Sequence, residues 1–244
     1  MLFRETIRKA SEAEGKWIRD FGGHWQYGHV RIRIEPLLRG AGIQLVPIEE
    51  KFFPAEYFPG VAQGLMSALA SGVLARYEVT DVLARVTNGS YHEVDSCVHA
   101  FAQATEEAVI KALLAAEPCL LEPVGSVKVT APEEFVGAVI GEINGREGRI
   151  EGMEHSGAKK QDVTVVARIP ERTLSGFERM LVESTQGRAD FSTSPGGYQE
   201  LRESIARLLS YCSGCERKVL PLGEAPICPD CNQILGAGDD YDAV

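Results

Sequence analysis

Apolar and polar positions alternate along some stretches of this chain and recur every three or four residues along others. Alternation marks half-buried strands, and the longer spacing marks helices with one buried face. The first part of the chain is predicted to contain an edge strand over residues 3–13, paired strands over 27–37 and 43–48, a helix over 54–72, a strand over 79–86 and a helix over 98–113. This order predicts an α/β layer of roughly 120 residues.

The pattern starts again after residues 118–125. It predicts strands over 127–131, 149–154, 163–169 and 189–193, with helices over 132–143 and 174–184. Their β-α-β-β-α-β order is that of the ferredoxin-like plait, so the predicted fold class is α+β. An amphipathic helix is expected over 198–211, and its apolar stripe requires a surface on which to pack.

Four of the six cysteines form two C-x-x-C pairs separated by twelve residues. Two such tight turns can place four thiolates around one tetrahedral ion, which predicts a structural zinc ribbon over 212–235. An iron centre and a redox-active dithiol pair are the alternatives. The predicted ligands are Cys212, Cys215, Cys228 and Cys231. Cys97 and Cys119 are expected to be small core residues, and residues 236–244 an acidic tail.

Two polar loops, 21–29 and 88–96, adjoin the predicted strands and are candidate binding tips. Ser90, His92 and Asp95 are residue types of a hydrolytic triad, but no nucleophile elbow surrounds the serine. As an alternative function, the polar side chains of these loops could hydrogen-bond to RNA while Trp25 or Tyr27 stacks on a base. As a structural alternative, the aromatic side chains could simply anchor the loops by packing. The candidate tip residues are Gly22, Gly23, His24, Trp25, Gln26 and Tyr27 in the first loop and Gly89, Ser90, Tyr91, His92 and Asp95 in the second.

Charge and motif content exclude several classes of function. The net charge of -10 argues against nonspecific nucleic-acid binding, although residues 1–40 hold eight Lys/Arg against five Asp/Glu. The sequence contains no apolar run of membrane-spanning length and no signal-peptide order, so a cytoplasmic protein without a membrane partner is expected. It also contains no phosphate-binding loop of the G-x-x-x-x-G-K-[ST] type, so this chain is not expected to be a GTPase or another enzyme.

Several short motifs resemble a known family. The segments 3–7, 26–30, 89–96 and 120–123 are similar to the fourth domain of the translational GTPase elongation factor G. The segments 130–134, 137–141 and 185–189 resemble its fifth domain. The resemblance implies a fourth domain over residues 1–121, with the helix 198–211 packed back on it, and a fifth domain over 122–194.

In this family the fourth domain is elongated, has a left-handed β-α-β crossover and inserts its tips into the decoding site of the small ribosomal subunit beside tRNA and mRNA. The resemblance places His92 at the position of the tip histidine. It also implies contact of the fifth domain with the sarcin-ricin loop region of the large subunit, for which Arg146 and Arg149 are candidates. The alternative interpretation is that these two arginines only lie at a solvated helix end and bind nothing.

The resemblance implies that GTP is bound only by a GTPase domain, which lies outside the matched segments. A monomer is expected. One departure from the family pattern lies in the first tip, where His24 and Trp25 replace the usual Arg-Gly pair. The four-cysteine segment is a second departure. The expected function is the ribosome-binding part of a translocation factor. The alternative is a stand-alone zinc-ribbon regulator that binds RNA or the ribosome, or a protein of the ribosome-protection type.

Overall fold

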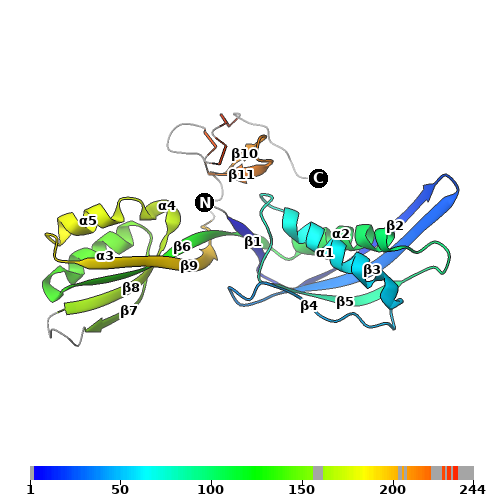
Figure 1. Cartoon of the computed structure of the whole chain (residues 1–244), viewed down its shortest axis with the longest axis horizontal. Coiled ribbons are helices and arrows are strands. Elements are labelled where there is room, and N and C mark those ends of the chain that lie inside the picture. Colours follow the sequence, from blue (N-terminus) through cyan, green and yellow to red (C-terminus); the bar gives the residue numbers. More distant parts are fainter. Residues whose placement is uncertain are drawn as a thin grey trace. The chain divides into compact units, whose positions relative to one another are not determined.

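A computed structural model describes residues 3–155, 162–202, 205, 208–220, 227–228, 230–231 and 233–235. The chain forms two compact units (Figure 1). The N-terminal unit is Phe3–Leu121 together with Glu200–Val244, and the central unit is Met1–Leu2 with Glu122–Gln199.

The N-terminal unit is built on a four-stranded sheet with two helices packed against one face (Figure 1). The sheet order is β2 (Ser11–Phe21), β3 (His24–Pro36), β5 (Val82–Ser90) and β4 (Ile43–Leu45). The helices are α1 (Phe58–Ser71), preceded by the short turn η1 (Ala55–Tyr57), and α2 (Val98–Ala115). Val30, Ile32 and Ile34 lie in their shared core, which confirms the predicted alternation.

Two predictions for this sheet were wrong. The run 3–13 is not one edge strand. It is divided between the short strand β1 (Arg4–Ile7) and the start of the long strand β2, which begins at Ser11. The segment β4 does not pair with β3; it pairs in parallel with β5, which lies between them. A parallel pair requires a crossover connection, and α1 supplies it between β4 and β5. The handedness of this crossover stays a prediction.

Glycines allow four close backbone contacts with α2. A Cβ on Gly60 of α1 would lie 2.2 Å from the carbonyl oxygen of Val98. A Cβ on Gly64 of α1 would lie 2.1 Å from the carbonyl oxygen of Ala102. On the hairpin of β2 and β3, a Cβ on Gly15 would lie 1.9 Å from the Ala104 oxygen, and one on Gly28 would lie 2.5 Å from Ala100 backbone atoms. Real Cβ atoms cannot approach this closely, so helix and hairpin fit against α2 only without these side chains.

The central unit has the predicted plait. Its sheet order is β7-β8-β6-β9, and α3 and α5 contribute to its core. The elements are β6 (Pro118–Pro132), η2 (Glu133–Phe135), α3 (Val136–Gly145), β7 (Arg149–His155), β8 (Asp162–Pro170), α4 (Glu171–Leu174), α5 (Phe177–Ser184) and β9 (Asp190–Glu200).

Several boundaries in this unit differ from the prediction. The first strand does not begin at Val127, because β6 starts at Pro118 and includes the residues that were expected to separate the two parts of the chain. The helix expected over 174–184 is divided into α4 and α5 at Gly176, whose φ of 73° lies in the left-handed region that glycine favours. The last strand does not end at Thr193, because β9 continues through Pro195, Gly196 and Gly197 to Glu200. Gly196 lies so close to β6 that a Cβ there would be 2.7 Å from the Ser126 nitrogen.

The predicted helix over 198–211 is shorter than expected, because β9 extends to Glu200 and β10 (Ser210–Cys212) begins ten residues later. Within that interval Ile205 is helical, and residues 203, 204, 206 and 207 lie outside the described residues. Leu201 is buried beside Phe3 and Leu120 in the N-terminal unit. The acidic tail also lies outside the described residues.

The first strand is fixed by a buried acid. β1 pairs with residues 118–121 of β6, and the Glu5 side chain is only 1% exposed. Its carboxylate accepts four backbone N–H bonds of 2.7–3.1 Å, from Val73, Leu74, Ala75 and Tyr77. Buried charge is tolerated where hydrogen-bond donors replace water, so this contact determines the path of residues 73–77.

No described helix combines the length and the apolar character that crossing a membrane requires.

Replacing Gly64 with alanine should destabilise the N-terminal unit by about 1–3 kcal/mol, because α1 must move away from Ala102. Urea unfolding followed by tryptophan fluorescence reports on this unit, since both tryptophans, Trp17 and Trp25, belong to it. Gly141→Ala is the control: it lies on α3 of the central unit with open space around it and should leave the fluorescence transition unchanged. An unchanged midpoint for Gly64→Ala would contradict the packing argument.

Candidate functional site

The first predicted tip is the end of a β-hairpin. Gly22 and Gly23 join β2 and β3 with φ angles of 65° and 91°, which two-residue hairpin turns require and glycine adopts without strain. The Asp20 carboxylate accepts the Gly23 N–H at 2.8 Å. The predicted loop 21–29 is therefore too long: His24 to Tyr27 belong to β3, and only the two glycines form the turn.

Trp25 is the most exposed large aromatic residue in the described part of this hairpin. Its side chain is 55% exposed and lies across the strand pair from Asp20. Tyr27, two residues further, is partly buried and has the Lys16 ammonium 5.7 Å from its ring centroid. Gln26 lies between them, and its buried side-chain oxygen has no partner among the described residues. Near the turn the hairpin thus carries an accessible ring.

The second predicted tip lies between β5 and α2. Gly89 and Ser90 end β5 rather than belonging to the loop, so the predicted span 88–96 is corrected to begin at Tyr91. His92 Nδ1 lies 3.0 Å from an Asp95 carboxylate oxygen, and its backbone N–H donates to Ser96 Oγ at 2.9 Å. Both contacts hold the loop in one conformation with the imidazole exposed.

The two predicted tips are in direct contact. The backbone N–H of Tyr27 in the hairpin donates to the Asp95 carbonyl oxygen of the second loop at 2.8 Å. A short parallel bridge joins Tyr27 to Ser96 at the same point. The two polar loops of the sequence suggested one probe, and the structure supplies the physical connection between them.

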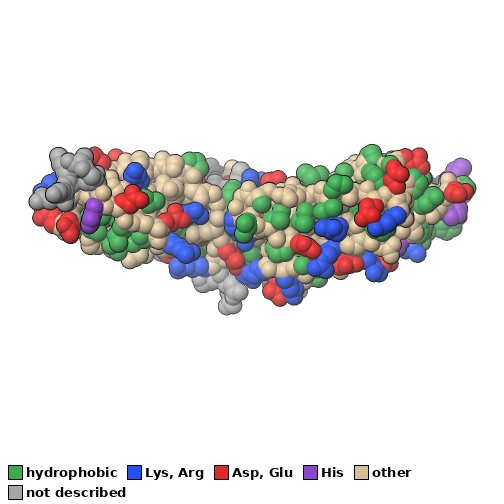
Figure 2. All heavy atoms as spheres, turned by 90° about the horizontal axis from the view of Figure 1, so that it is seen from below, with side chains coloured by type: hydrophobic (Ala, Val, Ile, Leu, Met, Phe, Trp, Pro, Cys, Tyr) green, Lys and Arg blue, Asp and Glu red, His purple; other side chains and the backbone are tan. Residues whose placement is uncertain are grey.

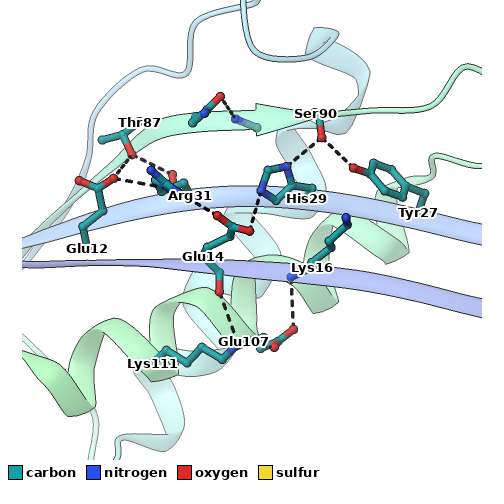
Figure 3. A network of polar contacts seen from close by, with 12 residues as sticks. Glu12, Glu14, Lys16, Tyr27, His29, Arg31, Thr87, Ser90, Glu107 and Lys111 are labelled. Atoms are coloured by element: carbon teal, nitrogen blue, oxygen red, sulfur yellow. Dashed lines mark hydrogen bonds and ion pairs between the residues drawn. The ribbon is translucent and has the colours of Figure 1, made fainter.

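A polar network on the open face of the sheet supports this site (Figure 3). Ser90 Oγ lies 2.7 Å from the Tyr27 hydroxyl and 2.8 Å from His29 Nδ1. His29 Nε2 in turn lies 3.5 Å from Glu14, whose carboxylate accepts from Arg31 at 2.9 Å. The hydrogen bond from Arg31, with the nearby His29, lowers the pKa of Glu14. Three strands are therefore connected just behind the tip.

Sequence analysis missed His29, Glu14 and Arg31 as supporting residues. The available signal was the alternation of acids and bases on two neighbouring segments, which is visible only once β2 is recognised as a strand. The same network argues against hydrolysis by the tip, because Ser90 bonds to Tyr27 and His29, whereas His92 pairs with Asp95. A Ser90–His92–Asp95 triad is not assembled.

Basic and acidic side chains are intermixed on the visible face of the molecule (Figure 2). On the sheet, Arg31 lies 2.9 Å from Glu14, and Arg33 bonds to Glu35 at 2.6 Å. Neighbouring acids thus offset the charge of these arginines. RNA binding at this site would depend on specific shape and stacking more than on a continuous basic surface.

The two arginines predicted for the central unit differ in their surroundings. Arg146 caps the end of α3 and donates to the carbonyl oxygens of Thr173 and Ser175, the latter at 2.8 Å. Its guanidinium also lies 5.5 Å from the centroid of Phe177. Arg149 is exposed on β7. Arg146 therefore already connects α3 to the loop before α5, and Arg149 is the more accessible cation.

The four predicted metal ligands converge. The sulfur atoms of Cys212, Cys215, Cys228 and Cys231 all lie within 4.8 Å of one another. Two of the separations are 3.5 and 3.7 Å. Four thiolates bound to zinc at ~2.3 Å in a tetrahedron lie about 3.8 Å apart, so this donor set fits such an ion. These four cysteines could hold a metal ion with no open coordination position.

Two short turns present these sulfurs. β10 pairs with β11 (Arg217–Val219), and Cys212 and Cys215 lie at the turn between them. A bridge between Ile227 and Ile234 frames the second pair. Burial raises the pKa of Cys228, but the N–H groups of Asp230 and Cys231 oppose it and lower the pKa to about 7, whereas hydrogen bonding with Cys231 raises the pKa of Cys215 to about 12. Backbone donors aimed at sulfur are typical of thiolate metal sites.

Comparisons with known proteins agree with this architecture. Residues 1–117 match the family model described as elongation factor G, domain IV, and residues 119–209 match the one described as elongation factor G C-terminus. The four cysteines lie beyond both matched regions.

Elongation factor G of Aquifex pyrophilus is 44% identical over 208 residues, which are 84% of this chain and 29% of that protein. A crystal structure of a protein from Thermus thermophilus superposes with a TM-score of 0.71 at 36% identity, covering 84% of this chain and 30% of the other. This chain thus spans less than a third of the length of these relatives. Together, the two matched regions and the shared fold show that the chain belongs to the elongation factor G family and comprises its domain IV and C-terminal region.

Proposed function

We propose that this chain is the ribosome-binding portion of an elongation factor G-like translation factor. In this proposal the joined tips enter the decoding site of the small subunit and contact tRNA and mRNA during translocation. The observation that supports it best is the hydrogen bond between Tyr27 and Asp95, because it presents His92 and the hairpin turn as one rigid probe. The chain then acts by shape and RNA contact and performs no bond chemistry itself.

The tip differs from a purely cationic probe. Trp25 offers an exposed ring, and stacking of a base on such a ring contributes about 1–3 kcal/mol. His92, held by Asp95, offers its remaining ring nitrogen to a phosphate or a base edge. We infer that the hairpin contacts an unpaired base and that the second loop contacts the backbone beside it.

The central unit is proposed to contact large-subunit RNA near the sarcin-ricin loop. Arg149 is the preferred residue, because the Arg146 guanidinium already bonds to two carbonyl oxygens. GTP would act only through a GTPase domain, which neither matched region contains. We expect a monomer that works in the cytoplasm, where ribosomes translate.

We also propose that the four cysteines bind one structural zinc ion. Zinc suits four thiolates in a closed tetrahedral site, and it adds no redox chemistry to a factor that needs none. A segment of this size, with only a small apolar cluster, gains most of its stability from such an ion.

Trp25→Ala should weaken co-sedimentation of the chain with bacterial ribosomes about tenfold, because a stacked base loses its partner. His92→Ala should weaken it several-fold through loss of a polar contact. Leu38→Ala is the matched control, since Leu38 is 87% exposed just past the opposite end of β3.

Binding should also fall as salt rises. Equal affinities for the tip variants and the control would contradict insertion of the tips. Binding to free RNA without binding to ribosomes would instead favour a zinc-ribbon RNA-binding regulator.

The purified protein should contain about one zinc ion per chain, and Cys215→Ser should remove most of it, as measured by elemental analysis. Cys97→Ser is the matched control. Its sulfur accepts the Ala100 N–H at the start of α2, a capping role that serine fulfils well, so zinc content should not change. Finding iron instead of zinc would contradict the proposed identity of the metal. Finding neither metal would refute the metal centre itself.

A further inference from the structure

The cysteine-bearing hairpin of β10 and β11 rests on the loop of residues 73–77, which belongs to the same N-terminal unit. The backbone N–H of Lys218 donates to the Ala75 carbonyl oxygen at 3.1 Å. The Arg217 guanidinium lies 5.4 Å from the ring centroid of Tyr77. Leu220 packs against the apolar cluster that includes Phe3 and Ala75. A hydrogen bond, a cation–π contact and apolar packing therefore all join the hairpin to one loop.

That loop is held rigidly from the opposite side. Ala75 and Tyr77 both donate their N–H groups to Glu5, at 2.8 and 3.1 Å. The Ala75 carbonyl remains available for Lys218, and the Tyr77 ring, 3% exposed, remains available for Arg217. Burial raises the pKa of Tyr77. The hydrogen bonds to Glu5 fix the loop in the position in which it meets the hairpin.

The hairpin carries two of the four predicted metal ligands, Cys212 and Cys215, close to the docking groups. Cys212 of β10 pairs directly with Arg217 of β11. Val219, between the docking residues Lys218 and Leu220, is buried with Cys212 and Cys228 on the sulfur side. A displacement of β11 away from the surface would therefore disturb the positions of the sulfurs.

We propose that Arg217 and Leu220 are positioning residues for the four-cysteine site, so that metal binding and docking on the N-terminal unit are coupled. The inference rests on the proposed metal centre and goes beyond it, because it assigns part of the metal affinity to residues that bind no metal. Coupling of this kind is reciprocal. Docking strengthens metal retention, and the bound metal stabilises the N-terminal unit.

The test is the rate of metal release from the full, zinc-loaded chain to an excess of a chromogenic chelator. Arg217→Ala should release zinc about three to ten times faster than the unsubstituted chain, because it loses the contact with Tyr77. Leu220→Ala should change the rate in the same direction. Lys218→Ala is the matched control: its side chain is exposed, and its backbone donor remains, so its rate should not change.

The reciprocal effect is measured by thermal unfolding followed through tryptophan fluorescence. Chelation should lower the midpoint of the unsubstituted chain by about 2–5 °C and should lower that of Arg217→Ala by less. Equal release rates for Arg217→Ala and Lys218→Ala, or a midpoint that chelation leaves unchanged, would overturn the coupling. An unsubstituted chain that retains no metal would refute the metal centre as well, and metal analysis of the starting material distinguishes the two failures.

Discussion

The carboxylate of Glu5 is the contact on which the N-terminal unit most depends. It is buried without a cation among the described residues, and four backbone N–H groups replace its water shell. The same residue joins β1 to β6 through backbone pairing and accepts the Thr80 N–H through its own carbonyl oxygen. Removing the carboxylate would leave four backbone donors without this acceptor, and those of Ala75 and Tyr77 are buried, so the cost is far more than the loss of one ordinary hydrogen bond.

Two other buried acids also fix neighbouring segments, but each has an arginine nearby: Arg39 lies 3.9 Å from Asp81, and Arg172 pairs with Glu122. Asp81 accepts the N–H groups of Gly40 and Gly42, which fixes the loop that leads to β4. Glu122 accepts from Arg172 at 2.8 Å and from Gln199 at 3.0 Å in the central unit. None of the three could be recognised from the sequence, because an isolated acid is ordinarily exposed, and only the fold shows which donors surround it.

Prediction from the sequence succeeded where one face of an element is buried. Apolar residues recur every three or four positions along the helix α2 and alternate with polar ones along the strand β3, and this spacing identified both elements. The strand β8 was identified in the same way. Prediction failed for β2, because this strand has Gly15 at a position where an apolar side chain would be expected. A side chain there would collide with the backbone of Ala104 in α2. At the candidate site, the glycine and histidine positions were visible in the sequence, whereas the partners His29 and Glu14 depended on a strand that had not been recognised.

The contacts of Gly15 and Gly28 with α2 also determine how the hairpin responds to load. Side chains can yield to a force by changing rotamer, but backbone in direct contact with backbone has no such freedom. We therefore expect low mechanical compliance where the hairpin crosses α2 at Gly15 and Gly28. A displacement of the unit is then carried into the hairpin through these contacts.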